Sequence, residues 1–246
     1  MAQDVQTSLR VIRSDGRFAT VETALGIFTV PQANVTMLGT MVTEQRRGIY
    51  DINGHGVRYG DVVLDCGANV GVYARHALLL GAAKVVAVEP APDSVECLRR
   101  NFVSEIAAGK LLVYPKGVWD TESVLDLHLN ADSWADSVAV NWGGKSIKVP
   151  LTTIDSLVRE LNLERVDFIK MDIEGAERQA LKGARETVRR HHPRMAVALE
   201  HLAADVDEIP ALIRKLWPGT RTLCGPCALE SPSGSLRVQP QVVAAF

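Results

Sequence analysis

The chain has 246 residues, of which 47% are hydrophobic and 23% charged, and this is the composition of a folded globular protein. Its 27 basic residues nearly balance 29 acidic ones, and only 5% of the residues are aromatic. The near-neutral charge gives no reason to expect a polyanionic partner, and the few aromatic side chains disfavour nucleic-acid binding by base stacking. Small-molecule chemistry is therefore the better starting hypothesis.

The chain start and the cysteines bear on the cellular compartment. The first residues lack the apolar core of a secretion signal, and no stretch approaches the roughly 18 apolar residues of a membrane helix. We therefore expect a cytoplasmic protein that does not interact with membranes. Four cysteines in a chain of this length do not form a disulfide framework, so we expect reduced thiols. We interpret Cys224-Gly-Pro-Cys227 as a turn.

Residues 1–48 predict a small extension that precedes the main domain. The segments R-F-A-T-V-E-T (17–23) and I-F-T-V-P (27–31) alternate in the way that is typical of a hairpin. A helix-like stretch then runs through Thr43–Arg47. The main domain would occupy residues 49–246.

From Gly60 onward, apolar strands alternate with amphipathic helices, which is the pattern of βαβ units. Such units have parallel strands and right-handed crossovers. The predicted fold class is therefore α/β, with a doubly wound, mostly parallel sheet. The predicted strands cover residues 61–66, 84–90, 111–118, 166–172, 195–200, 220–224 and 237–246, and the predicted helices cover 72–82, 93–102, 152–163 with Thr153 as N-cap, 175–190 and about 209–217.

Residues 120–150 interrupt this alternation and predict an inserted β-hairpin. Its strands are S-V-L-D-L-H-L (123–129) and K-S-I-K-V-P-L (145–151). Trp119, Trp134 and Trp142 lie within or beside the hairpin, and flat apolar rings suit a sugar or polyketide surface. We interpret the connecting loop as a substrate lid, with an ordinary surface hairpin as the alternative.

The most informative motif closes the first strand of the main domain. In Asp65-Cys-Gly-Ala-Asn-Val-Gly71, the glycines allow a tight turn, and the helix that follows presents unpaired N–H groups. The G-x-x-x-G spacing differs from the G-x-G-x-x-G of dinucleotide folds. Glu89 ends the next strand, where an acidic side chain accepts hydrogen bonds from ribose hydroxyls. A ribose-containing cofactor is therefore favoured over a purely structural turn.

A second set of polar residues follows two later strands. Asp172 and Glu174 leave one strand end beside Lys170, and Glu200 and His201 end the next strand. Ligands bind at this edge of an open α/β sheet. These titratable side chains are therefore candidates for proton transfer.

Together these motifs resemble the FkbM family of S-adenosylmethionine-dependent O-methyltransferases. The resemblance extends from about Gly60 to His201 and rests on G-D-V-V-L-D-C-G-A-N-V-G-V-Y-A, V-V-A-V-E-P-A-P and V-D-F-I-K-M-D-I-E-G-A-E-R-Q-A-L-K-G-A. It implies the class I methyltransferase (Rossmann-like) fold, with a seven-stranded sheet whose last strand is antiparallel. It also implies S-adenosylmethionine as the methyl donor.

The resemblance further implies roles for individual residues. The loop of residues 65–71 would line the methionine part of the cofactor, Glu89 would hold the ribose, and the residues after the third strand would approach the adenine. The implied cofactor-binding residues are Asp65, Gly67, Ala68, Asn69, Gly71, Glu89, Gly117, Val118 and Trp119.

We expect methyl transfer to a hydroxyl group of a small molecule, either a sugar or a polyketide. Asp172, Glu174 or His201 would take the hydroxyl proton. Alternatively, Asp172, Glu174 and Glu200 would bind a hard divalent cation such as Mg²⁺. An NAD-dependent oxidoreductase and a non-catalytic cofactor-binding relic are the other hypotheses, and the chain could form homo-oligomers.

Overall fold

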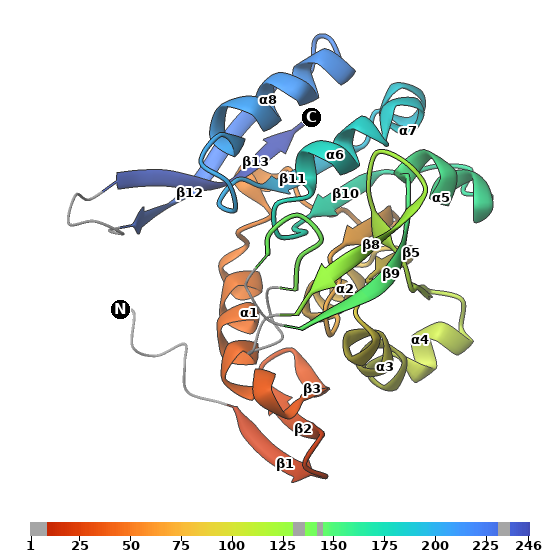
Figure 1. Ribbon diagram of the computed structural model, residues 1–246, viewed down its shortest axis with the longest axis vertical. Helices are drawn as coiled ribbons and strands as arrows, with labels where there is room; N and C mark the ends of the chain where they lie inside the picture. Colours follow the sequence, from red (N-terminus) through yellow and green to blue (C-terminus); the bar gives the residue numbers. More distant parts are fainter. Residues whose placement is uncertain (1–8, 130–135, 142–144, 231–236) are drawn as a thin grey trace.

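A computed structural model describes residues 9–129, 136–141, 145–230 and 237–246 (Figure 1). Its central layer is a sheet of seven strands: β4 (Val62–Cys66), β5 (Lys84–Val88), β6 (Leu111–Tyr114), β10 (Phe168–Met171), β11 (Arg194–Ala198), β12 (Thr222–Glu230) and β13 (Arg237–Ala245). Their order is β12-β13-β11-β10-β4-β5-β6. Neighbouring strands are parallel except where β13 pairs with β11 and β12. The predicted α/β class with an antiparallel last strand is therefore confirmed.

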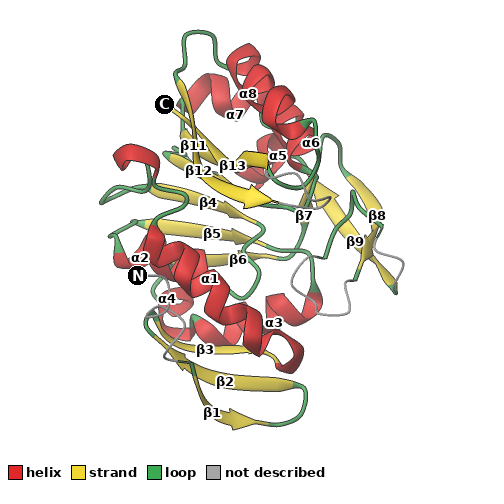
Figure 2. Ribbon diagram, turned by 90° about the vertical axis from the view of Figure 1, so that its left-hand side faces the viewer, coloured by secondary structure: helices red, strands yellow, loops and turns green. Residues whose placement is uncertain are grey.

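Helices cover both faces of this sheet (Figure 2). They are α2 (Val72–Leu79), α3 (Pro92–Asn101), α4 (Val103–Ala107), α5 (Ile154–Glu160), α6 (Glu177–Lys182), α7 (Arg185–His191) and α8 (Asp205–Leu216). On one face, α5 to α8 bury Leu157, Leu181 and Ile213 against the sheet. On the other face, α2 and α3 bury Tyr73 and Leu98. Among the described residues, no helix combines the length and the apolar character that crossing a bilayer requires.

The chain order of the sheet reverses between β4 and β10. From β4 the sheet continues to β5 and β6 on one side, and from β10 it continues to β11 on the other. Cys66 at the end of β4 is paired with Met171 at the end of β10. In an open α/β sheet, the crevice at the carboxyl ends of two such strands is where ligands bind.

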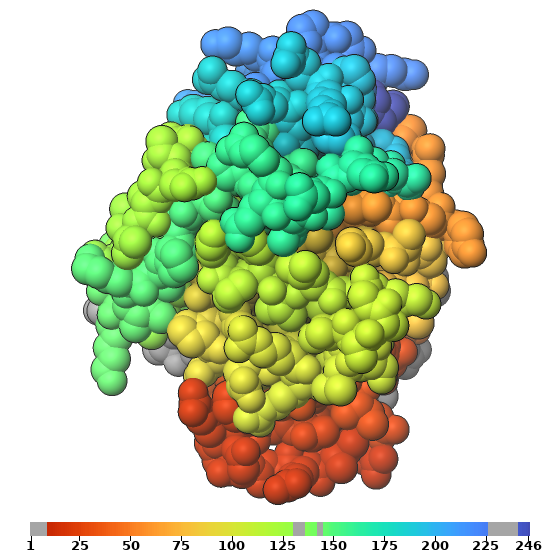
Figure 3. Space-filling view, turned by 90° about the vertical axis from the view of Figure 1, so that its right-hand side faces the viewer, coloured from red at the N-terminus to blue at the C-terminus, as the bar shows by residue number. Residues whose placement is uncertain are grey.

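The N-terminal residues form a separate antiparallel sheet at one end of the molecule (Figure 3). It comprises β1 (Arg10–Ser14), β2 (Phe18–Thr23) and β3 (Gly26–Pro31), and a short 3-10 helix (Gln32–Asn34) leads into α1 (Val35–Arg47). The predicted hairpin corresponds to β2 and β3, whereas β1 was not predicted. The helix begins at Val35, before the predicted Thr43. Burial of Leu38 against the N-terminal sheet stabilises this first part of the helix, although its residues have a weak intrinsic helix propensity.

Another short 3-10 helix (Ile52–Gly54) leads toward the main sheet, and a third sheet contains the predicted hairpin. In that sheet β8 (Ser123–His128) and β9 (Ser146–Thr152) are antiparallel, and β7 (Gly117–Val118) pairs with β9. The prediction of one continuous strand over residues 111–118 is wrong. Pro115, which has no N–H to donate, separates β6 from β7.

The predicted lid can be followed only in part. Trp134 and Trp142 lie outside the described residues. Trp119 packs with Leu127 and Val149 beneath the third sheet.

Three local predictions have different outcomes. Thr153 is the N-cap of α5, and its hydroxyl accepts the Ser156 N–H at 2.9 Å, as predicted. The predicted helix over 175–190 is instead two helices, α6 and α7, with a break at Gly183, where a Cβ atom would lie 2.2 Å from the carbonyl oxygen of Trp119. The predicted turn at residues 224–227 is wrong, because β12 runs through it and only Pro226 is skipped in the pairing with β13.

Candidate active site

A pocket of about 940 Å³, including the part open to solvent, lies at the carboxyl ends of β4, β5 and β10. It is lined by the glycine loop after β4, the ends of β5 and β10, helix α1 and the inserted third sheet, and also by residues of α2 and α3.

The glycine loop, defined as residues 67–71, has backbone conformations that few residues adopt. Gly67 has φ +77°, and a Cβ atom there would lie 1.9 Å from the carbonyl oxygen of Asp172. Asn69 also has positive φ (48°) although it carries a side chain. Its amide oxygen accepts the Val70 N–H at 2.8 Å, and such a local bond favours this conformation for Asn. The loop is thus held close to the strand end that carries Asp172.

Glu89 connects this loop to the end of β5. Its carboxylate accepts the Asn69 N–H at 2.8 Å and the Ala91 N–H at 2.9 Å. Burial raises the pKa of Glu89 to about 7, although both N–H groups favour its charged form. The carboxylate therefore lies on the pocket wall in a fixed orientation.

A buried ion pair supports the loop from below. Asp65 is fully buried, and its Oδ1 lies 3.4 Å from Nζ of Lys170. The same ammonium group donates to the carbonyl oxygen of Gly67 at 2.8 Å. Burial raises the pKa of Asp65 to about 6. Burial opposes the charge on Lys170, but Asp65 and Asp172 together keep its pKa above the ordinary value.

Asp172 and Glu174, which follow β10, also line the pocket. Tyr50 donates its hydroxyl to Oδ2 of Asp172 at 2.6 Å. Burial disfavours the charge on Asp172, but Lys170, His201 and this hydroxyl hold its pKa below the ordinary value. Glu174 has the opposite environment, because burial and the negative charge of Asp172 raise its pKa to about 8. Its backbone has φ +55°, an uncommon conformation that is often found at functional sites.

His201 lies behind these two carboxylates and does not itself line the pocket. Its Nε2 lies 3.4 Å from both Asp172 Oδ1 and Glu174 Oε2, and its Nδ1 lies 3.0 Å from Oε1 of buried Glu177. Burial opposes a charge on the imidazole, but the three carboxylates raise its pKa to about 10. These carboxylates therefore favour the protonated, cationic form of the imidazole.

Helix α1 and the inserted sheet supply the outer walls. Met41 and Glu44 come from α1, and Leu127 and Asp136 come from the insertion. Burial raises the pKa of Glu44 to about 7, and the charge of Asp172 adds to this shift. Acidic groups therefore face the pocket from an element far from the motifs in sequence.

The structure separates the predicted cofactor residues into two sets. Three are not among the lining residues: Asp65 lies beneath the loop, Gly71 packs against α3, and Trp119 packs in the third sheet. The predicted residues that line the pocket are Gly67, Ala68, Asn69, Glu89, Gly117 and Val118.

The predicted cation ligands are also divided. Among the described residues, Asp172, Glu174 and His201 form a group whose ligand atoms lie within 4.8 Å of one another. Glu200 is not part of this group, and its Oε2 accepts a hydrogen bond from Nε2 of Gln241 at 3.0 Å.

Tyr50 and Glu44 are among the pocket residues that the sequence-based prediction missed. Neither belongs to a local motif, and both reach the pocket only through the packing of α1 and the residues after it. The only sequence feature that pointed to Glu44 was an acidic side chain in the helix-like stretch of the predicted N-terminal extension.

The comparisons with known proteins agree with this architecture. A family model described as the methyltransferase FkbM domain matches residues 65–217, which is well over half of the chain. The chain belongs to the FkbM methyltransferase family. This family and its shared fold imply S-adenosylmethionine as the methyl donor.

One curated relative of this FkbM-family chain is the 31-O-demethyl-FK506 methyltransferase FkbM of Streptomyces tacrolimicus, 26% identical over 192 residues that cover 65% of this chain and 74% of the relative. Among solved structures, a methyltransferase FkbM from Methylobacillus flagellatus KT has a TM-score of 0.58 at 18% identity, over 88% of this chain but 56% of that one. An S-adenosylmethionine-dependent methyltransferase from Agrobacterium tumefaciens has a TM-score of 0.50 at 10% identity, over 95% of this chain and 71% of that one. Both structures share the fold of this chain.

Proposed function

We propose that this chain is an S-adenosylmethionine-dependent O-methyltransferase that acts on a hydroxyl group of a small molecule, such as a sugar or a polyketide. One pocket lined by two kinds of group is the main support for this function. Glu89 and the glycine loop line it, and so do Asp172 and Glu174. A cofactor bound through its ribose and an acceptor with a hydroxyl group would meet in this pocket.

The residues around Glu89 fit S-adenosylmethionine. Each carboxylate oxygen of Glu89 accepts one backbone N–H and retains a lone pair for a ribose hydroxyl. Gly67 and Ala68 present backbone without bulky side chains to the methionine part, and Gly117 and Val118 would flank the adenine. The bound cofactor supplies an electrophilic methyl group, so the protein has only to align the acceptor and remove its proton.

Glu174 is the base in this proposal. Its carboxylate lines the pocket, and a pKa of about 8 makes it a stronger proton acceptor than an ordinary carboxylate. Asp172 is held ionised by Lys170, His201 and Tyr50, so it would orient the acceptor hydroxyl rather than take its proton. Two nearby carboxylates with pKa values shifted in opposite directions are typical of sites that divide such roles.

His201 would act as a cation in place of a metal ion. In its protonated form it already balances the charges of Asp172 and Glu174, and a metal would have to displace its proton. We therefore expect methyl transfer to continue in the presence of EDTA. Loss of activity in EDTA, with recovery on adding Mg²⁺ or Mn²⁺, would support the cation site instead.

The first experiment tests cofactor choice. Calorimetry should detect binding of S-adenosylhomocysteine and no binding of NAD⁺. Glu89→Gln should weaken S-adenosylhomocysteine binding by roughly 10- to 100-fold, because hydrogen bonds to a charged acceptor contribute about 1.5–3 kcal/mol. Binding of NAD⁺ alone would favour the oxidoreductase hypothesis.

The second experiment tests the reaction. Methyl-labelled S-adenosylmethionine would be incubated with a panel of sugars and polyketides, and mass spectrometry would locate the label. A label on a hydroxyl oxygen supports the proposal, whereas transfer to nitrogen or carbon contradicts it. Cofactor binding without any transfer across the panel would favour the non-catalytic relic.

A further inference from the structure

Asn101, the last residue of α3, connects two parts of the molecule that are distant in sequence. Its Oδ1 accepts the Thr29 N–H of β3 at 2.6 Å, and its Nδ2 donates to the Thr29 carbonyl at 3.0 Å. The same Nδ2 donates to the carbonyl oxygen of Val70 at 2.9 Å. The Asn101 side chain therefore hydrogen-bonds both backbone polar groups of Thr29, as a neighbouring β-strand would. It also hydrogen-bonds the glycine loop.

The bond to Val70 fixes a peptide group in the middle of this loop. The Val70 N–H donates to Oδ1 of Asn69, so Asn69 and Asn101 together hold both backbone polar groups of Val70. The next N–H, that of Gly71, donates to the Ala68 carbonyl at 2.8 Å. The orientation of the Val70–Gly71 peptide therefore determines where the backbone of Ala68 and Asn69 lies on the pocket wall.

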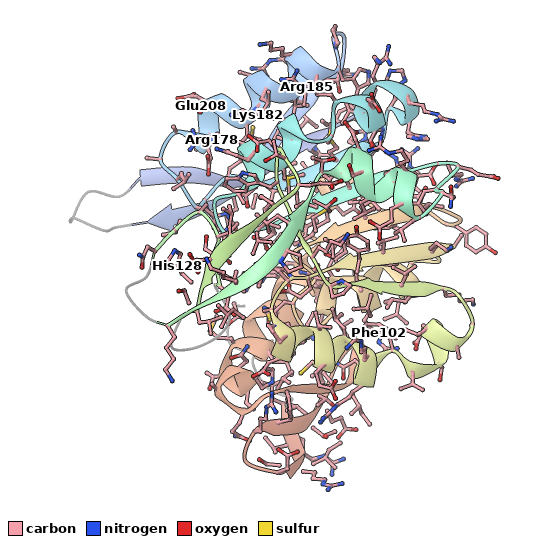
Figure 4. The ribbon with its side chains drawn as sticks, turned by 45° about the vertical axis from the view of Figure 1, so that its right-hand side comes forward. Phe102, His128, Arg178, Lys182, Arg185 and Glu208 are labelled. Atoms are coloured by element: carbon pink, nitrogen blue, oxygen red, sulfur yellow. The ribbon has the colours of Figure 1, made fainter. Side chains whose placement is uncertain are left out.

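The end of α3 also packs tightly on the loop. A Cβ atom at Gly71 would lie 2.3 Å from Cε2 of Phe102 and 2.9 Å from Cδ2 of Leu98, and Figure 4 labels Phe102 at this end of the helix. The guanidinium group of Arg75 donates to the Asn101 carbonyl at 2.6 Å and so ties α2 to the same place. The loop cannot shift toward α3, and Asn101 prevents it from moving away.

We infer that Asn101 is a positioning residue, which holds the glycine loop in its cofactor-binding conformation. Its own side chain is kept in place by hydrogen bonds to Thr29 of the N-terminal sheet. The inference rests on the proposed use of S-adenosylmethionine. Thr29 occupies two of the three hydrogen bonds of the Asn101 side chain and thereby fixes the rotation of the amide. The backbone of Thr29 then supports the cofactor site through Asn101, although no residue of β1, β2 or β3 lines the pocket.

The test measures binding of S-adenosylhomocysteine, which requires no knowledge of the acceptor. Asn101→Asp keeps the size of the side chain and the acceptor for the Thr29 N–H, but it turns an oxygen toward the carbonyls of Thr29 and Val70. We expect the dissociation constant to rise about tenfold or more, which corresponds to the loss of a partly buried hydrogen bond. Asn101→Ala, which introduces no repulsion, should weaken binding in the same direction and provides the measurement if the Asp variant does not fold.

Two matched variants separate positioning from general destabilisation. Asp155→Asn alters a carboxylate that accepts three hydrogen bonds at the start of α7, on the other face of the sheet. Arg17→Ala breaks an exposed ion pair between the same N-terminal sheet and Asp93 of α3. Either variant can lower the melting temperature, but both should bind S-adenosylhomocysteine as the wild type does.

Each outcome is informative. Asn101 variants that bind within about twofold of the wild type would overturn the inference, as would equal weakening in Asp155→Asn, because binding would then follow stability alone. A wild-type chain that does not bind S-adenosylhomocysteine would overturn the proposed function itself, and the inference with it. Weak binding confined to the Asn101 variants, at temperatures where circular dichroism shows them folded, supports the positioning role.

Discussion

At the scale of single residues, Asp172 and Glu174 show how two carboxylates of one short segment acquire different properties. Asp172 faces the Lys170 ammonium, the Tyr50 hydroxyl and the His201 imidazole, so its charge is compensated. Glu174 is buried near that same charge with less compensation, and its pKa rises to about 8. The proton of an acceptor hydroxyl would therefore go to Glu174.

This difference predicts the pH dependence of the reaction. Glu174 loses its proton as the pH rises through its pKa, so its basic form accumulates at high pH, and kcat/KM should rise with pH and level off above about pH 8. Glu174→Gln should lower kcat by roughly 10²- to 10⁴-fold and remove this dependence. As a control, Asp126→Asn changes an exposed carboxylate on β8 and should retain the wild-type profile. An unchanged pH profile in Glu174→Gln would assign the base to another group.

At the scale of secondary-structure elements, α6 and α8 are joined by an ion pair in which one partner is buried. Nε of Arg178 in α6 lies 3.1 Å from Oδ1 of Asp205, and Asp205 is only 1% exposed. Arg178 also pairs with Glu208, and Figure 4 labels both residues. Arg178→Met should reduce the free energy of unfolding by about 1–3 kcal/mol, because it leaves the Asp205 carboxylate buried without its cation. Chemical denaturation measures this loss. Glu208→Gln, which removes only the exposed partner, should cost less than about 1 kcal/mol.

Helix α1 places an acidic side chain where it can affect acceptor specificity. Glu44 lines the pocket from α1, outside the glycine loop. Glu44→Gln should raise the KM for the acceptor by roughly 5- to 10-fold, because an acceptor hydroxyl would lose a charged partner. The affinity for S-adenosylhomocysteine should change by less than about twofold. Glu96→Gln, on the exposed side of α3, is the matched control and should leave both constants unchanged. A loss of cofactor affinity in Glu44→Gln would place Glu44 in the cofactor site instead.

Features encoded in contiguous residues were predictable from the sequence. The main strands follow from apolar runs, Thr153 from its N-cap pattern, and the Glu89 position from its place at a strand end. The break at Gly183 was not predictable, because it arises where the carbonyl of Trp119 approaches the helix from another part of the chain. Tyr50 and the position of His201 behind the carboxylates likewise depend on how distant elements pack.

At the scale of the whole molecule, a nearly balanced charge conceals a strongly uneven distribution. The chain has 27 basic and 29 acidic residues, yet the pocket is lined by five acidic side chains, Glu44, Glu89, Asp136, Asp172 and Glu174, and by Lys170 as its one basic lining residue among those described. Lys170 is already paired with buried Asp65. Above about pH 8, where Glu44, Glu89 and Glu174 are ionised, this excess of acidic groups should make the pocket favour neutral or cationic acceptors.

The charge of the acceptor therefore provides a test of how the pocket selects substrates. Once the panel has identified an accepted alcohol, its monophosphate ester, with another hydroxyl left for methylation, should show a kcat/KM at least about tenfold lower, because a doubly charged group meets carboxylates at the pocket wall. Raising the ionic strength from about 0.05 to 0.5 M should narrow this difference, since salt screens the exposed part of the repulsion. Glu44→Gln should narrow it as well, whereas Glu96→Gln should not. A phosphate ester that is methylated faster than the alcohol would mean that a basic side chain other than Lys170 binds the phosphate, and the acceptor class would have to be sought among anionic compounds.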